Sequence, residues 1–326
     1  MHKRKILITG AAGFLGYHLA SALSEDAANA LLLVDNLERG RLDADFESLL
    51  RRSNVQFRAG DLTQASTYDG LGEGFDEVYH LAAIIGVKNV LEKPHHVVRV
   101  NALTTLLLLE WFVNGGGRKL LFSSTSEAYA WTQKFHALPI PTPEDVPLAL
   151  VDLRDPRSAY AGSKIFGELA IAQYGRRYAM PFVIVRYHNV YGPRMGMEHV
   201  IPQLYERALK GERPLVVYSP GHRRAFCYVA DAVRATIAAM RTRAAEGQTF
   251  NIGNDAEEVA IGDLATRLLE RAHLRAAIEP REAVNDPIVR RCPDLTKARA
   301  VLGYHPAVSL QDGLDLTLAW YKTWLM

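Results

Sequence analysis

The sequence predicts an α/β fold, a doubly wound parallel sheet with a smaller α/β domain, and two observations predict it. In the first half of the chain, short apolar runs alternate with segments of helical periodicity, which is typical of parallel strands joined by helices. In the second half, an apolar run at residues 214–218 and helical patterns at residues 261–272 and 310–324 lie beyond this alternation. The 326 residues suffice for one large or two modest domains.

Composition restricts the class of protein. Hydrophobic residues make up 48% of the chain and charged residues 23%, as in soluble globular proteins. The net charge of +2 gives no reason to expect a nucleic acid or a membrane surface as partner. The apolar run at residues 103–113 is too short to span a bilayer, and the N-terminus lacks the apolar stretch of a signal peptide. The two cysteines, Cys227 and Cys292, are far apart, which fits a reducing cytoplasm and predicts neither a disulfide framework nor a metal site.

A glycine-rich turn separates the first expected strand, at residues 5–9, from a helical pattern that continues to Leu23. Glycine permits a tight turn and lets backbone N–H groups approach a pyrophosphate at the helix N-terminus. An ordinary strand-to-helix turn is the alternative, but it rarely needs three glycines at this spacing. The expected dinucleotide contacts are Gly10, Gly13, Phe14, Leu15 and Gly16.

The second expected strand, at residues 31–35, ends in a carboxylate. Asp35 lies 19 residues after Gly16, and in Rossmann-type domains a carboxylate about 20 residues beyond the glycines binds the adenosine ribose. Its charge would repel a 2′-phosphate, so the sequence predicts NAD rather than NADP as cofactor. Asn36 is expected beside the ribose, and a helix cap is the alternative role of Asp35.

Two further strands are expected at residues 55–62 and 78–83. The end of the first should lie near the adenine, although Asp61 could instead cap the next helix. The small residues that end the second would let the chain pass close to a flat cofactor, and His80 within it is expected to be a core histidine. The expected cofactor contacts are Asp61, Leu62, Leu81, Ala82 and Ala83.

A helical pattern at residues 100–113 is apolar on nearly all sides, so it should be buried on more than its sheet-facing side. We expect it to form a subunit interface in a homodimer. The alternative is that another part of the same chain covers it.

The centre of the predicted site follows the fifth strand, at residues 118–122, where residues 123–129 (SSTSEAY) bring hydroxyls and one carboxylate together. Ligands bind at the carboxyl ends of parallel strands. Later in the chain Tyr160 and Lys164 are four residues apart at the start of a helix, so they share one face. A nearby ammonium lowers the pKa of a phenol, which could then act as a base, whereas a plain surface pair is the alternative.

With these motifs in this order, the chain resembles the extended short-chain dehydrogenase/reductase family, which acts on nucleotide-sugars. The resemblance covers nearly the whole chain. It implies that Tyr160 is the base on the sugar 4-hydroxyl, that Lys164 holds the nicotinamide ribose, and that Thr125 hydrogen-bonds the same sugar oxygen. The motif residues that carry it are Gly10, Gly13, Gly16, Asp35, Asp61, Thr125, Tyr160 and Lys164.

The resemblance also implies a division of the chain. Residues 1–186 and 226–253 would form the NAD-binding Rossmann domain, and residues 187–225 and 254–326 the nucleotide-sugar-binding domain. The expected substrate contacts are Lys88, Asn189, Val200, Arg224 and Arg291, with Asn189 and Arg224 on the diphosphate.

Within the family, an acid at the position of Glu127 is typical of 4,6-dehydratases and UDP-glucuronate decarboxylases and unusual in simple 4-epimerases. Residues 290–295 (RRCPDL) resemble the decarboxylases' Lys-Arg-Lys-Pro-Asp-Ile segment, in which Arg291 matches the arginine that works with the glutamate. The resemblance therefore favours decarboxylation of UDP-glucuronate to a UDP-pentose, and a surface ion pair is the alternative for these two residues. The expected catalytic residues are Thr125, Ser126, Glu127, Tyr160, Lys164 and Arg291.

Three alternatives remain beside the decarboxylase. A 4,6-dehydratase and a 4-epimerase would share its first step, and residues 84–90 (IIGVKNV) are closer to the epimerase pattern. A nucleotide-sugar or NAD(H) sensor without turnover would have no need of Thr125, Tyr160 and Lys164 together.

Overall fold

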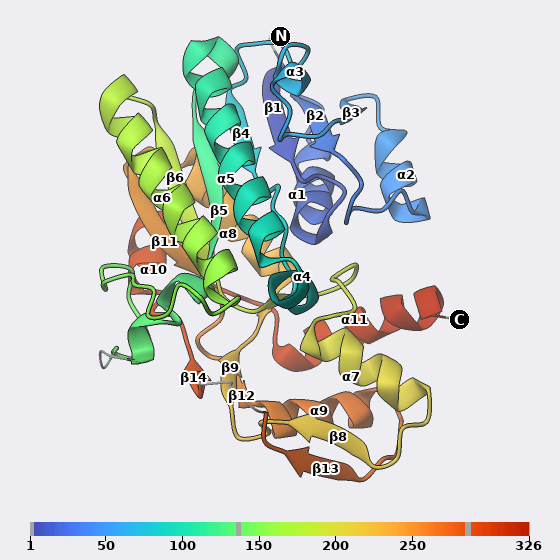
Figure 1. Ribbon diagram of the computed structural model, residues 1–326. Helices are drawn as coiled ribbons and strands as arrows, with labels where there is room; N and C mark the ends of the chain where they lie inside the picture. The colour runs from blue at the N-terminus through green and yellow to red at the C-terminus, as the bar shows by residue number, and fades with distance from the viewer. Residues whose placement is uncertain (1–2, 135–137, 284–287, 326) are drawn as a thin grey trace.

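The computed structural model describes residues 3–134, 138–283 and 288–325. A seven-stranded parallel sheet forms its centre, in the order β11-β6-β5-β4-β1-β2-β3 (Figure 1). The first six strands in chain order have the 3-2-1-4-5-6 arrangement of a dinucleotide-binding sheet. The strands are β1 (Arg4–Thr9), β2 (Asn29–Asp35), β3 (Val55–Ala59), β4 (Glu77–His80), β5 (Leu120–Thr125), β6 (Phe182–Tyr187) and β11 (Gln248–Ile252).

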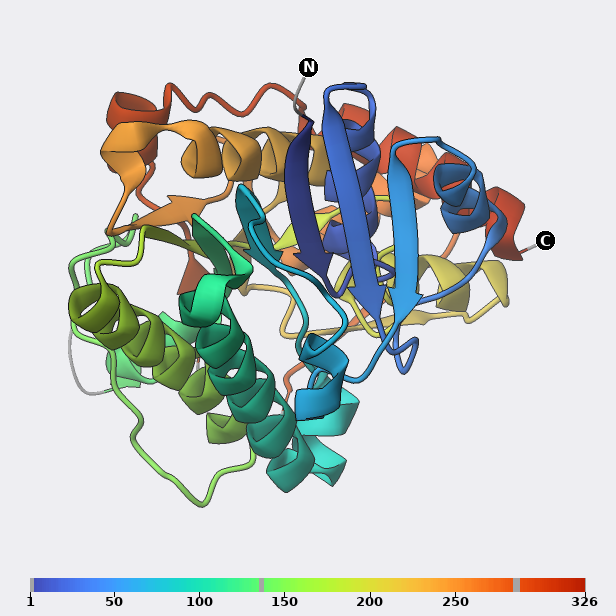
Figure 2. The same ribbon diagram turned by 90° about the horizontal axis from the view of Figure 1, so that it is seen from above.

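Helices cover both faces of the sheet, so the strands are buried on both sides (Figures 1 and 2). Alternate residues of β1 show this, because Ile6 and Ile8 belong to one apolar cluster and Leu7 to the other. One layer contains α1 (Phe14–Ser24) and α8 (Val229–Arg241), and the other contains α3 (Ala65–Tyr68), α5 (Pro94–Trp111) and α6 (Ser158–Tyr178). The predicted fold class is therefore confirmed.

A smaller α/β unit lies beside the carboxyl ends of the strands (Figure 1). Its parallel pair β8–β13 packs on α9, and a three-stranded sheet has the order β12-β9-β14. The predicted boundaries between the two domains stay a prediction. The elements of this half are β7 (Val190–Tyr191), α7 (Val200–Leu209), β8 (Leu215–Tyr218), β9 (Arg223–Ala225), β10 (Cys227–Tyr228), β12 (Glu258–Ala260), α9 (Ile261–Arg271), β13 (Ile278–Arg281), β14 (Arg290–Arg291), α10 (Thr296–Leu302) and α11 (Leu310–Leu325).

Several strand boundaries differ from those expected from the sequence. The third and fourth strands end earlier than predicted, at Ala59 and His80, and the residues that follow them line a cavity instead of continuing the sheet. The fifth strand extends further, to Thr125, because it pairs along its whole length with β6. The remaining short elements of the first half are α2 (Ala44–Leu50), α4 (Val87–Glu92) and two 3-10 turns, at Ser126–Tyr129 and Thr132–Lys134.

Helix α5 begins at Pro94, earlier than predicted, and continues through a π-helical turn to Gly116. Within the described ranges, this is the one helix long and apolar enough to cross a membrane by length and composition. Its inner side, with Val97, Leu108 and Leu109, is fully buried, and the helix packs along α6. We therefore assign it as a core helix of the α/β domain.

Candidate active site

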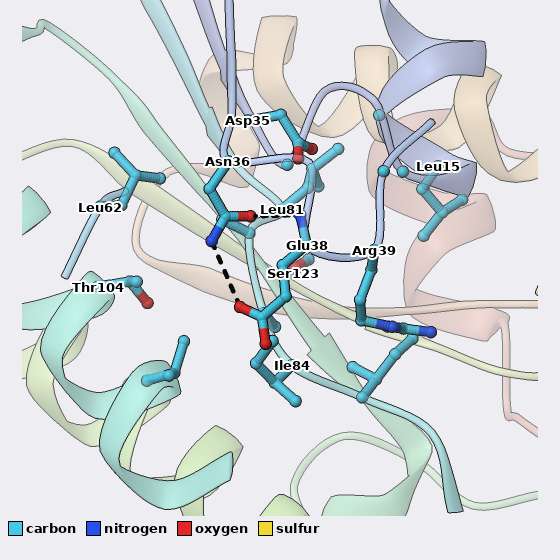
Figure 3. Close-up of a pocket in the computed structure, with 18 of the residues that line it drawn as sticks. Leu15, Asp35, Asn36, Glu38, Arg39, Leu62, Leu81, Ile84, Thr104 and Ser123 are labelled. Atoms are coloured by element: carbon cyan, nitrogen blue, oxygen red, sulfur yellow. Dashed lines mark hydrogen bonds between the residues drawn. The ribbon is translucent and has the colours of Figure 1, made fainter. Parts of the chain in front are cut away.

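Two adjoining cavities follow the carboxyl ends of the parallel strands. The first, of about 180 Å³, extends from the turn after β1 to the ends of β2, β3 and β4, and Figure 3 shows it in close-up. The second, of about 630 Å³, lies between the end of β5, helix α6 and the smaller unit. Ser123, Leu15 and Arg39 line both, so a ligand can extend from one cavity into the other.

The glycine turn allows close approach of the backbone in the first cavity. Gly10 has a φ of +69°, and a Cβ placed there would lie 2.8 Å from the Cα of Ala82. A Cβ on Gly16 would lie 2.1 Å from the carbonyl oxygen of Gly10. Gly13 precedes α1, whose first turn has no side-chain cap, so its backbone N–H groups are available to a phosphate.

Asp35, at the end of β2, accepts hydrogen bonds from the backbone N–H groups of Ala12 (3.0 Å) and Leu37 (2.7 Å). Burial raises the pKa of Asp35, and these two hydrogen bonds act against that shift. These two backbone groups fix the orientation of the Asp35 carboxylate, and Asp35 does not serve as the cap of a helix. Figure 3 shows it near Asn36, whose side chain contacts Glu38 at 3.4 Å.

Every residue predicted to contact the cofactor from the glycine turn and from β2, β3 and β4 lines the first cavity. Asp61 accepts hydrogen bonds from the backbone N–H (2.9 Å) and hydroxyl (2.8 Å) of Thr63, so it holds a turn and does not cap α3. His80 is buried, and its ring nitrogens contact the hydroxyls of Thr9 and Thr105 at 2.9 and 3.3 Å, as expected of a core histidine.

The second cavity gathers all the residues that were predicted to be catalytic. Thr125 ends β5, and its hydroxyl accepts a hydrogen bond from the backbone N–H of Glu127 (3.2 Å). Tyr160 and Lys164 are one turn apart on α6. The cavity-lining residues of this set are Thr125, Ser126, Glu127, Tyr160, Lys164 and Arg291.

The protonation of the Tyr160–Lys164 pair differs from the expectation that the lysine lowers the pKa of the phenol. Burial raises the pKa of Tyr160 to about 12, and the opposing effects come from a hydrogen bond with Thr125 and from the charge of Arg39. Burial also lowers the pKa of Lys164 to about 7, because the ammonium is surrounded by protein. Lys164 Nζ donates instead to the carbonyl oxygen of Ser123 (2.7 Å) and lies 4.9 Å from the centre of the Phe122 ring.

Glu127 and Arg291 form a bidentate ion pair inside the second cavity. Arg291 Nη2 donates to Glu127 Oε2 at 3.0 Å, and Nη1 donates to Oε1. The arginine side chain is only 13% exposed and the glutamate 41%. Strand β14 carries Arg291 and pairs with β9, so the smaller unit contributes this group to a site built mainly on the sheet.

Behind the cavity lies a buried polar network that joins β5, β6 and β11. Ser124 donates to Glu168, which also accepts from Arg186 Nε at 2.9 Å. Arg186 Nη1 donates to the hydroxyl of Tyr129 (2.8 Å), which donates in turn to Asn251 Oδ1 (2.9 Å). These bonds hold the strand ends that carry the site.

Of the predicted substrate contacts, Asn189 and Arg224 line the second cavity together with Arg291. The side-chain nitrogen Nδ2 of Asn189 is buried and has no hydrogen-bond partner among the described residues. Lys88 and Val200 are not brought to the cavity. Lys88 is exposed on α4, and other residues of that helix, such as Val90, line the cavity. At Val200 it is the preceding residue, His199, that lines the cavity.

Sequence reasoning missed cavity-lining residues that come from distant segments. They include Arg39, Arg157, Arg194 and His199, which carry no motif of their own. Trp320, in α11 near the end of the chain, lines the same cavity and donates to Asp45 at 2.8 Å. No local signal could have shown that the last helix returns to the site.

The chain is similar to known proteins over nearly its whole length. Residues 6–253 match the NAD dependent epimerase/dehydratase family. A UDP-N-acetyl-alpha-D-glucosaminuronate decarboxylase of Bacillus cytotoxicus is 34% identical over 98% of both chains. UDP-glucuronic acid decarboxylase 5 of Arabidopsis thaliana is 32% identical over 96% of this chain and 87% of its own.

Solved structures of 4-epimerases resemble this chain at a similar sequence identity to these decarboxylases. The UDP-glucuronic acid 4-epimerase of Bacillus cereus, in complex with UDP-glucuronic acid and NAD, has a TM-score of 0.84 and 31% identity over 98% of this chain and 99% of its own. The UDP-glucose 4-epimerase of Thermotoga maritima with UDP-glucose has a TM-score of 0.85 and 29% identity, covering 99% and 100% of the two chains.

The dinucleotide turn, the acidic end of β2 and the tyrosine–lysine pair of α6 define a nucleotide-dependent enzyme of the short-chain dehydrogenase/reductase type. Within that class the chain belongs to the NAD dependent epimerase/dehydratase family, whose relatives include decarboxylases and 4-epimerases of nucleotide-sugars at similar identity. NAD is the cofactor of this family, and the glycines and Asp35 of the first cavity fit it.

Proposed function

We propose that the protein decarboxylates a UDP-linked uronic acid to a UDP-pentose, with UDP-glucuronate as the leading substrate. The observation that carries this proposal is the Arg291–Glu127 pair, which lies in the same cavity as Thr125, Tyr160 and Lys164. A guanidinium is a planar fork of donors that suits a carboxylate such as the one on C6 of the sugar.

The residues that line the first cavity would hold NAD, with the pyrophosphate at the N-terminus of α1 and the adenosine ribose on Asp35. Bound NAD supplies the redox chemistry, taking a hydride from C4 of the sugar and returning it after carbon dioxide has left. Lys164 would donate to the nicotinamide ribose, since its Nζ already points to the strand end at Ser123.

Tyr160 would remove the proton of the sugar 4-hydroxyl, and Thr125 would hydrogen-bond the same oxygen. With its pKa raised to about 12 by burial, the phenol is protonated at neutral pH and needs positive charge nearby before it can act as a base. Arg39 already contributes in this direction, and Lys164, when protonated, would contribute further.

Once C4 is a ketone, the C6 carboxylate belongs to a β-keto acid. Arg291 would orient that carboxylate, and Glu127 would hold Arg291 in place. The C5–C6 bond then breaks, carbon dioxide leaves, and the electron pair forms an enolate across C4 and C5, which takes a proton at C5. Asn189 and Arg224 would bind the diphosphate.

The test is incubation of the pure protein with NAD and UDP-glucuronate, with the products identified by mass spectrometry and proton NMR. Loss of the mass of carbon dioxide with formation of a UDP-pentose would establish the proposal. The 2-N-acetylated uronate is the second substrate to test, because one of the similar decarboxylases is named for it.

A 4-epimerase is the second candidate, and the similarity to the Bacillus cereus enzyme favours it. It would leave the mass unchanged and invert C4. The 4,6-dehydratase, in which Glu127 would remove the C5 proton, would release water from C6. A sensor that binds without turnover would leave every substrate unchanged.

We also propose a homodimer formed through α5 and α6, which lie side by side on one face of the sheet (Figure 1), in a reducing compartment such as the cytoplasm. Exposed apolar side chains on the pair, with exposed fractions of 45% for Val98 and 56% for Leu169, support it. Leu169→Glu should convert the dimer to a monomer in light scattering, whereas Leu42→Glu, at a 51% exposed leucine elsewhere, should not. An unchanged mass for the first variant would refute this interface.

A further inference from the structure

A small cavity lies behind the active site, between the 3-10 turn after β5, the residue that follows β6 and strand β14. The volume open to the centre of a water molecule is about 10 Å³, which is close to the minimum that one water needs. His188 and Arg291 both line it. The cavity is separate from the two described above, although Ser126 and Arg291 line it as well as the second one.

Two buried atoms of these residues lack a hydrogen-bond partner within the described part of the chain, namely His188 Nδ1 and Arg291 Nε. His188 is 2% exposed. An unpaired buried polar atom is costly, and buried polar groups are nearly always paired with protein or with an ordered water. Because both residues line one water-sized cavity, we look for a shared partner of the two atoms there.

The hydrogen-bond roles of the two atoms complement each other. Asn251 Nδ2 donates to the carbonyl oxygens of Thr142 (2.9 Å) and Asp294 (3.3 Å), which fixes the orientation of its amide. Asn251 Oδ1 then accepts from His188 Nε2 (3.1 Å), so this nitrogen carries the proton. Burial lowers the pKa of His188 to about 3, so the ring is neutral and Nδ1 is an acceptor. Arg291 Nε–H can only donate.

The other two nitrogens of the Arg291 guanidinium already bind the carboxylate of Glu127. A bond at Nε would therefore hold the remaining edge of the guanidinium plane. It would connect the ion pair of the active site to the rigid network around Asn251, which also anchors the backbone at Thr142 and Asp294.

We propose that this cavity holds one water molecule, which accepts a hydrogen bond from Arg291 Nε and donates one to His188 Nδ1, and that His188 is thereby a positioning residue for the Arg291–Glu127 pair. The water site does not depend on the proposed function. The positioning role rests on the proposed decarboxylation, in which Arg291 orients the carboxylate that leaves.

Two substitutions of His188 test separately the hydrogen bond at Nε2 and the proposed hydrogen bond at Nδ1. The amide of His188→Gln can reach the Nε2 position and still bond Asn251, but it leaves no acceptor at the Nδ1 position. His188→Asn has the opposite effect, since its amide lies where Nδ1 was. We expect His188→Gln to slow release of carbon dioxide by about tenfold, the usual effect of one hydrogen bond, while reduced nicotinamide still forms in a single turnover. His188→Asn should stay near the parent rate.

The reverse order, with His188→Gln unaffected and His188→Asn impaired, would show that His188 acts only through Asn251 and would overturn the positioning role. A high-resolution crystal structure of the NAD-bound parent tests the water directly. Density within hydrogen-bond distance of both His188 Nδ1 and Arg291 Nε supports the site, and a dry cavity or a direct contact between them refutes it. If the parent releases no carbon dioxide from any uronate, the proposed function and the positioning role both fail, and the density still decides the water site.

Discussion

Replacing Glu127 by glutamine tests whether its ion pair serves chemistry or stability. The glutamate side chain is 41% exposed, so its pair with Arg291 should contribute about 1 kcal/mol or less to the free energy of unfolding. The melting temperature should then fall by no more than about 2–4 °C. A hydrogen bond to a charged group is worth about 1.5–3 kcal/mol when the reaction depends on it, which predicts a loss of about 10- to 150-fold in the rate of decarboxylation.

The assay follows reduced nicotinamide and sugar products in the same single turnover. With Glu127→Gln, oxidation at C4 should proceed nearly as in the parent, because Tyr160, Lys164 and Thr125 are unchanged. The 4-keto sugar and reduced cofactor should then accumulate, since the later step is slow.

The neighbouring Arg290–Glu258 pair provides a matched control. It is also bidentate, with distances of 2.6 and 2.8 Å, and neither residue lines the cavity. Glu258→Gln should leave the product pattern unchanged. Equal product formation by Glu127→Gln, Glu258→Gln and the parent would refute the reasoning and reduce Glu127–Arg291 to a surface ion pair.

Three further predictions concern the cofactor and the catalytic pair. Tyr160→Phe should abolish turnover and leave NAD binding measured by calorimetry largely intact, so near-normal activity would contradict the mechanism. Gly10→Ala should abolish NAD binding, because its Cβ would lie 2.8 Å from the Cα of Ala82. Gly72→Ala is the control, since Gly72 has a φ of +82° but no atom within 4 Å of the added Cβ, and this variant should bind NAD normally. Equal NAD binding by the two variants would count against the role of the glycine turn. Lys164→Met should stabilise the NAD-free protein most below about pH 7, because the folded parent then holds a buried ammonium. Between about pH 7 and about pH 10.4 the folded parent loses this proton while the unfolded chain keeps it, so the gain in unfolding free energy should shrink by about 1.4 kcal/mol per pH unit. A gain that does not depend on pH would refute the assigned pKa.

The sequence predicted the sheet and its first cavity well, because each of these features is encoded within a few residues. The turn at Gly10, the acid that ends β2 and the alanines after β4 all carry local patterns, and all line the cavity. The apolar run at residues 214–218 corresponds to β8, but the strands of two or three residues, such as β14, were not predicted because so few residues show no periodicity.

Other features of the site depend on tertiary packing and have no local pattern in the sequence. Lys88 was placed from a family pattern, yet it lies on an exposed face of α4. Trp320 reaches the site only because α11 folds back across the molecule. The pKa of Tyr160 was predicted from its spacing to Lys164, but burial is the largest influence on both groups and raises the one pKa while it lowers the other.

The placement of Arg291 has a consequence for how such proteins can diversify. Thr125 ends a six-residue strand at the centre of the sheet, and Tyr160 and Lys164 stand on a 21-residue helix, so changes there would disturb the whole domain. Arg291 stands on a two-residue strand at the edge of a three-stranded sheet, outside the seven-stranded sheet that carries the rest of the site. An ancestral enzyme of this architecture could thus keep its first step constant while drifting, one peripheral residue at a time, toward a new product.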